Sequence, residues 1–285
     1  VLSVSGSTPF ILFGFGFADS FFESMSGITT TGATVIAGLD DLPKSLLIYR
    51  QLLQWLGGMG LIVLAIAVMP LLGIGGGQLF KTQTPGPMSE QRLTPRITST
   101  ARALWSIYFV LTVLCIFAYR LAGMSYFDAV SHAFSTVSIG GFSTHDLSIG
   151  FFDSLSIEIV CITFMLLSAM SFAVHYSAIY RKQVLKYFYD PELRFFVSLL
   201  IVILGLVCLS LFANDIDNPI RSGLFQTVSI LTTTGFLTDE YSSWPASISF
   251  MLLVGAFIGA CSGSVGGGIK SCLLYTSPSP RDSAL

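Results

Sequence analysis

The chain has 285 residues, of which 53% are hydrophobic and only 11% are charged. Soluble domains usually carry about 25% charged residues, so this composition, with a mean hydropathy of +0.76, indicates a membrane protein. The net charge of −2 and the lack of a basic tract give no reason to expect nucleic-acid binding, and the five scattered cysteines match no metal or redox spacing.

The first structural unit is expected over residues 1–72. A helix predicted over residues 18–28 is too short to cross a bilayer and suits a re-entrant segment. It leads into a Thr-Thr-Thr-Gly loop at residues 29–32, and an uncharged run over residues 52–72 is long enough to span. The apolar stretch before the short helix is broken by glycine and proline, so it is not expected to span by itself and could be the end of a spanning helix. Because the chain starts at Val1 and not at a methionine, we expect an N-terminally truncated unit.

The second unit is expected over residues 103–180. A span is predicted at residues 103–119, followed by a short helix over residues 125–136. A looser copy of the loop, Val137-Ser138-Ile139-Gly140-Gly141, comes next. A further single span then begins after Asp153 and runs through about Ile179.

The third unit is expected over residues 195–270. An uncharged span at residues 195–212 precedes a short helix over residues 219–231, with proline favourably placed in its first turn. The third copy of the loop, Thr232-Thr233-Thr234-Gly235-Phe236, follows it. A last span begins at Trp244 and reaches a glycine-rich break.

Two basic linkers set the expected orientation in the membrane. The segments over residues 73–102 and 181–194 hold eight Lys/Arg against three acids. Basic residues favour the cytoplasmic side, so the short helices and their loops should enter from outside. The expected fold class is therefore an all-α membrane protein, built from repeated helix–pore loop–helix units around a central ion pore.

The repeated loops suit a potassium filter. A dehydrated cation needs oxygen ligands, which backbone carbonyls supply when the chain leaves helical geometry, and glycine tolerates the positive φ that this requires. A single Thr-Gly copy would be an ordinary turn, whereas three copies in matching context favour a filter. The predicted filter residues are Thr30, Thr31, Gly32, Ser138, Ile139, Gly140, Thr233, Thr234 and Gly235.

Four motifs resemble one known family. They are Thr29-Thr30-Thr31-Gly32-Ala33-Thr34, Gln54-Trp55-Leu56-Gly57-Gly58-Met59-Gly60, Ser138-Ile139-Gly140-Gly141-Phe142-Ser143-Thr144-His145-Asp146 and the glycine-rich stretch from Gly259 to Gly268. Together they resemble the TrkH potassium-uptake subunits of the Trk/Ktr/HKT superfamily.

The resemblance implies four helix–pore–helix repeats around a potassium filter, with Gly32, Gly140 and Gly235 as filter glycines. In that family a serine at the first filter position goes with sodium transport, so Gly32 favours potassium. The resemblance also implies a multi-pass protein of the bacterial inner membrane, a homodimer, and a TrkA-like cytosolic nucleotide-binding regulatory subunit. Potassium would be the transported substrate, and no cofactor is expected.

The resemblance further implies an intramembrane gate loop below the filter. Its glycines are Gly259, Gly263, Gly266, Gly267 and Gly268. A run so rich in glycine holds a helix poorly, since each glycine costs roughly 1 kcal/mol relative to alanine. The alternative is a helix-packing face in which Gly255, Gly259 and Gly263 allow close approach.

Several expectations remain open at this stage. The fourth repeat is missing, and residues 271–285 read as an unrelated Ser/Pro-rich tail, which we expect to be an artefact fused to a truncated frame. Alternatives are a sodium-selective or non-selective monovalent cation transporter, or a non-transporting scaffold. An enzyme is not expected, because no acid/base or metal set is visible. Arg50 is expected to snorkel, Glu23 to brace a loop, cap a helix or stabilise the ion, and the three histidines to be structural.

Overall fold

The computed structural model describes residues 2–68, 97–216, 218–239, 241, 244–261 and 263–269. The predicted tail at 271–285 and most of the predicted linker at 73–102 lie outside these residues. Within the described part the chain is helical, with one isolated backbone bridge between Ile258 and Ile269 and no extended strand. The expectation of an all-α membrane fold is confirmed.

The first unit contains a short helix between two others. Its elements are α1 (Leu2–Leu12), α2 (Phe17–Ile28), the 3-10 turn η1 (Leu39–Asp41) and α3 (Lys44–Val68). The short helix α2 begins one residue before the predicted boundary. Helix α3 begins eight residues before the predicted span, so it includes the charged side chain of Arg50.

The second unit begins with a longer helix than predicted and differs most after Asp153. Its elements are α5 (Ile97–Leu121), α6 (Tyr126–Val137), η3 (Ser148–Phe152), α7 (Leu155–Ala169) and α8 (Phe172–Tyr180). The hydroxyl of Ser125 accepts a hydrogen bond from the amide of Asp128, which caps α6. The span expected from Asp153 to about Ile179 is not one continuous helix, because α7 and α8 are bent by 94° at the intervening break.

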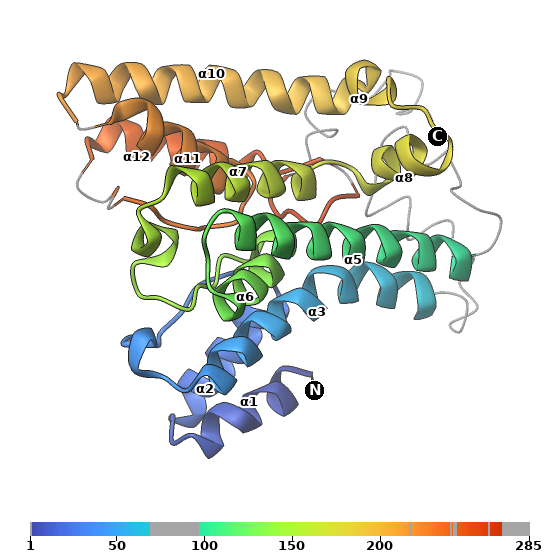
Figure 1. Cartoon of the computed structure of the whole chain (residues 1–285), viewed down its shortest axis with the longest axis vertical. Coiled ribbons are helices and arrows are strands. Elements are labelled where there is room, and N and C mark those ends of the chain that lie inside the picture. Colours follow the sequence, from blue (N-terminus) through green and yellow to red (C-terminus); the bar gives the residue numbers. More distant parts are fainter. Residues whose placement is uncertain are drawn as a thin grey trace, which may run out of the picture.

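The third unit places its short helix as predicted. Its elements are α9 (Lys186–Tyr189), α10 (Pro191–Ala213), α11 (Pro219–Leu231) and α12 (Ala246–Phe257). Helix α10 starts at a proline behind the cap Asp190, whose carboxylate accepts from the amide of Leu193. Figure 1 shows the three units following one another along the long axis, in chain order.

Two described helices, residues 102–121 of α5 and all of α10, are long and apolar enough to cross a membrane, and the bent α7–α8 pair makes a third candidate. Large apolar side chains on these helices remain exposed, among them Phe117 at 64% and Leu209 at 68%. Many polar side chains of the short helices, among them Glu23, His132 and Gln226, are instead buried. This inversion suits a protein with lipid outside and a polar centre.

Candidate ion filter

Three loops follow the three short helices, and they share one backbone conformation. We call residues 29–33, 138–142 and 232–236 the first, second and third filter loops. The second residue past each helix end has a positive φ, 54° at Thr30, 53° at Ile139 and 64° at Thr233. Positive φ is strained for β-branched residues, so the same costly conformation recurs three times. Such strain is characteristic of functional sites.

A hydrogen bond in each loop fixes how the three loops correspond. The amide of Thr31 donates to the carbonyl of Ser26 at 2.9 Å, Gly140 donates to Ser135 at 2.9 Å, and Thr234 donates to Ser229 at 2.8 Å. Gly140 therefore occupies the place of Thr31 and Thr234.

The glycine that matches Gly32 and Gly235 is Gly141. All three have a positive φ, of 78°, 84° and 79° respectively. The expected equivalence of Gly140 with Gly32 and Gly235 is wrong by one residue, and Ser138 takes the place of Thr29 and Thr232. The sequence holds a signal that gives the correct register, because Ser26, Ser135 and Ser229 each lie six positions before the matching glycine.

The filter loops meet one another. A Cβ atom built on Gly32 would lie 2.2 Å from the carbonyl oxygen of Gly140 and 3.6 Å from that of Thr234. A Cβ built on Gly141 would lie 2.0 Å from the same Thr234 oxygen. Three segments that are about a hundred residues apart in the chain therefore converge, and side chains at Gly32 and Gly141, though not at Gly235, would collide with a neighbouring loop.

A buried ion pair braces the first loop. Arg50 on α3 and Glu23 on α2 are both fully buried and pair at 2.6 Å. The Glu23 carboxylate accepts from the hydroxyl of Thr34 and the amide of Val35, while Arg50 also donates to Thr34 and to the carbonyl of Ser143. The expectation that Arg50 snorkels is wrong, and of the roles left open for Glu23 the contacts favour bracing.

The other two short helices carry polar side chains at the position of Glu23. His132 on α6 bonds through Nε2 to the hydroxyl of Ser143 at 3.0 Å, and Gln226 on α11 donates to the carbonyl of Asp239 at 3.2 Å. Each therefore ties its helix to the segment that leaves the filter loop. The structural role expected for His132 agrees with this geometry, but the pairing with Ser143 was missed.

The glycine-rich segment doubles back beneath the third loop. The amide of Gly267 donates to the hydroxyl of Thr233 at 2.8 Å. Helix α12 ends at Phe257, so Gly259 and Gly263 do not lie on its face, and the helix-packing alternative is wrong. Two backbone bonds tie the segment to the α7–α8 break, one from Cys261 to the carbonyl of Ala169 and one from Phe172 to that of Gly263, each at 3.1 Å.

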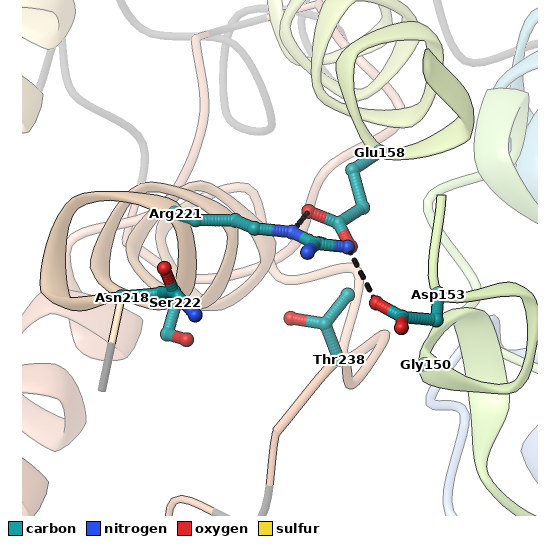
Figure 2. Close-up of a pocket in the computed structure, with 7 residues that line it drawn as sticks. All are labelled: Gly150, Asp153, Glu158, Asn218, Arg221, Ser222 and Thr238. Carbon is teal, nitrogen blue, oxygen red and sulfur yellow. Dashed lines mark hydrogen bonds and ion pairs between the residues drawn. The ribbon is translucent and has the colours of Figure 1, made fainter. Parts of the chain in front are cut away.

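Charged side chains also join each unit to the next. His145 bonds Asp40, which lowers the pKa of that carboxyl below its ordinary value of 3.8. Figure 2 shows Arg221 of α11 reaching Glu158 on α7 and Asp153 beside it, with nitrogen–oxygen distances of 2.8 and 2.9 Å. Among the described residues no group of three or more His, Cys, Asp or Glu could hold a metal ion.

The comparison with known families agrees with this architecture. A family model named TrkH, described as a cation transport protein, matches residues 2–282. The chain belongs to the TrkH family.

Curated relatives and a solved structure from that family are similar to this chain over most of its length. The Trk system potassium uptake protein TrkH of Halomonas elongata is 52% identical over 276 residues, covering 95% of this chain and 57% of the relative. The Escherichia coli K12 protein of the same name is 46% identical over 277 residues, with the same two coverages. The crystal structure of the potassium transporter TrkH from Vibrio parahaemolyticus superimposes with a TM-score of 0.82 at 47% identity, covering 95% of this chain and 56% of that one. This TrkH-family chain thus spans somewhat more than half the length of these relatives.

Proposed function

We propose that the full-length protein takes up potassium through a pore lined by the three filter loops and a fourth segment of the complete protein. The observation that carries the proposal is the convergence of three loops with one strained backbone conformation. Such loops turn main-chain oxygens into ligands for a cation that has left its water. The printed names of the relatives and of the solved structure support potassium as the ion.

The proposed filter keeps the predicted residues of the first and third loops, and shifts the second by one. Its members are Thr30, Thr31, Gly32, Ile139, Gly140, Gly141, Thr233, Thr234 and Gly235. Below it, Gly259, Gly263, Gly266, Gly267 and Gly268 form the proposed gate. The bond between Gly267 and Thr233 supports this assignment, because it joins the gate segment directly to a filter residue.

The cell context is proposed from the family. The protein would act in the bacterial inner membrane as a homodimer, with a TrkA-like cytosolic nucleotide-binding subunit as regulator. The membrane potential would drive uptake, since it contributes about 2.3 kcal/mol per charge per 100 mV. The units at residues 1–72, 103–180 and 195–270 are proposed to act as three quasi-equivalent quarters of the pore.

The test uses the full-length protein in a bacterium deficient in potassium uptake. Rubidium uptake is measured with sodium as competitor, for wild type and for Gly32→Ser. We expect wild type to restore growth at low potassium and Gly32→Ser to lose discrimination against sodium. The matched control is Gly123→Ser, because Gly123 also has a positive φ, of 109°, but has no described atom within 4 Å of its Cβ position. Equal selectivity of the two variants would refute the filter assignment of Gly32.

A further inference from the structure

The second filter loop is held differently from the other two. In the first loop the hydroxyls of Thr29 and Thr31 bond at 2.8 Å, and in the third loop those of Thr232 and Thr234 bond at 2.8 Å. The second loop has Gly140 where the others have Thr31 and Thr234, so it cannot form this pair. Some other group must stabilise it.

The side chain of Gln54 fills the space that a threonine would need. A Cβ atom on Gly140 would lie 2.4 Å from both Cδ and Oε1 of Gln54, and 2.8 Å from its Nε2. Gln54 is fully buried and belongs to α3, a helix of the first unit. Glycine is therefore required at position 140 because a neighbouring unit supplies the polar group there.

Gln54 also makes the hydrogen bonds that hold the loop. Its Nε2 donates to the carbonyl of Gly140 at 2.7 Å, and its Oε1 accepts from the hydroxyl of Ser135 at 2.6 Å and the amide of Phe142 at 3.2 Å. These three bonds use both ends of the amide. A carboxamide offers a donor and an acceptor on one planar group, whereas an ionised carboxylate offers acceptors alone.

The corresponding serines of the other loops donate directly to a main-chain carbonyl. The hydroxyl of Ser26 donates directly to the carbonyl of Ala33 at 2.6 Å, and that of Ser229 to Phe236 at 2.7 Å. In the second unit Ser135 donates to Gln54 instead. In the other two units the serine bonds its own loop directly, whereas in the second unit the side chain of Gln54 lies between the serine and the loop.

We propose that Gln54 is a positioning residue for the ion filter: it replaces the missing threonine of the second loop and sets the geometry on which ion discrimination depends. The proposal rests on the proposed function of the filter. It adds a specificity-determining side chain that lies outside the three loops themselves.

The first experiment compares two buried amides on one helix in the full-length protein. Gln54→Met removes the three bonds at similar volume, and Gln54→Glu keeps the acceptor but removes the donor to Gly140. Gln51→Met is the control, because Gln51 is equally buried and its side chain bonds no described group. Rubidium uptake and its inhibition by sodium are measured at matched membrane abundance. We expect discrimination to fall about tenfold or more in Gln54→Met, since buried groups lose their partners, and to change little in Gln51→Met.

The second experiment exchanges the two sides of the contact. Gly140→Thr alone should abolish selective uptake, because the new side chain would overlap Gln54. Gly140→Thr combined with Gln54→Ala should recover uptake and discrimination, since it recreates the threonine of the other loops beside the hydroxyl of Ser138. Recovery in the double variant supports the proposal even where a single variant fails to reach the membrane.

The outcomes separate this inference from the proposed function. Absence of potassium uptake by the wild-type protein would overturn the proposed function. Uptake by wild type, with Gln54→Met as selective as Gln51→Met, would overturn the role of Gln54 and leave the filter intact. A double variant no better than Gly140→Thr alone would likewise overturn the replacement of threonine by Gln54.

Discussion

The buried pair of Glu23 and Arg50 gives the sharpest stability prediction. Neither side chain is exposed, and Arg50 donates to Glu23, Thr34 and the carbonyl of Ser143. Arg50→Met would leave the carboxylate with only the hydroxyl of Thr34 and the amide of Val35. Removing one partner of a buried pair costs about 3–5 kcal/mol. For a protein of this size that corresponds to a fall in Tm on the order of 10 °C.

The assay is thermal unfolding of the purified full-length protein in detergent at one fixed heating rate. Arg120→Met is the control, because Arg120 is exposed and its loss should cost less than about 1 kcal/mol. The double variant Glu23→Gln with Arg50→Met removes both charges, so it should melt above Arg50→Met. If the fall in Tm of the double variant equals the sum of the falls in the two single variants, the stranded carboxylate is not the cause and the reasoning fails.

Three further predictions concern the proposed gate segment and the ion pair of Arg221 with Glu158. Gly259→Ala would place a Cβ atom 1.9 Å from the carbonyl oxygen of Gly267, so the segment could not fold back. The maximum rate of rubidium uptake should therefore rise, with discrimination against sodium unchanged. Thr233→Val removes only the hydroxyl bonded to Gly267, so the maximum rate of rubidium uptake should rise less than in Gly259→Ala. A rate equal to that of wild type would contradict this. Arg221→Met strands the nearly buried carboxylate of Glu158 and should lower Tm by a few degrees, on the order of 1 kcal/mol after screening; an unchanged Tm would refute this.

The sequence predicted the short helices well because their signals are local. Each is apolar on one side, too short to span, and followed by a copy of the repeated loop, which reads Thr-Gly in the first and third units and Ile-Gly-Gly in the second. The third helix, Pro219–Leu231, agrees with its prediction at both ends. The predicted spans at residues 52–72, 103–119 and 195–212 also correspond to single helices where they lie in the described residues. The break between α7 and α8 was missed because residues 170–171 are Met and Ser, which carry no breaking signal. Its geometry depends on backbone bonds to Gly263 and Cys261, ninety positions away.

The register of the second loop was missed for a different physical reason. The sequence pattern aligns Gly140, the first glycine of a Gly-Gly pair, with Gly32 and Gly235. The positive φ of those two glycines recurs instead at Gly141, the second glycine of the pair. Only the contact with Gln54 explains why the first glycine is there at all. Likewise a lone arginine in an apolar helix gives no indication of its partner, and the pairing with Glu23 depends on how α2 and α3 pack.

Two side chains of α3 explain how the first and second filter loops keep a fixed position relative to each other. Arg50 and Gln54 lie four residues apart, so they project from the same face of the helix. Arg50 reaches the carbonyl of Ser143 and its guanidinium lies 4.4 Å from the ring centre of Phe142, while Gln54 holds Gly140 and the amide of Phe142. Because the same Arg50 is paired with Glu23 of the first unit, any shift of α3 must displace both loops together. The first two quarters of the proposed filter therefore depend on one helix face, and a change there should alter ion discrimination without touching a filter residue.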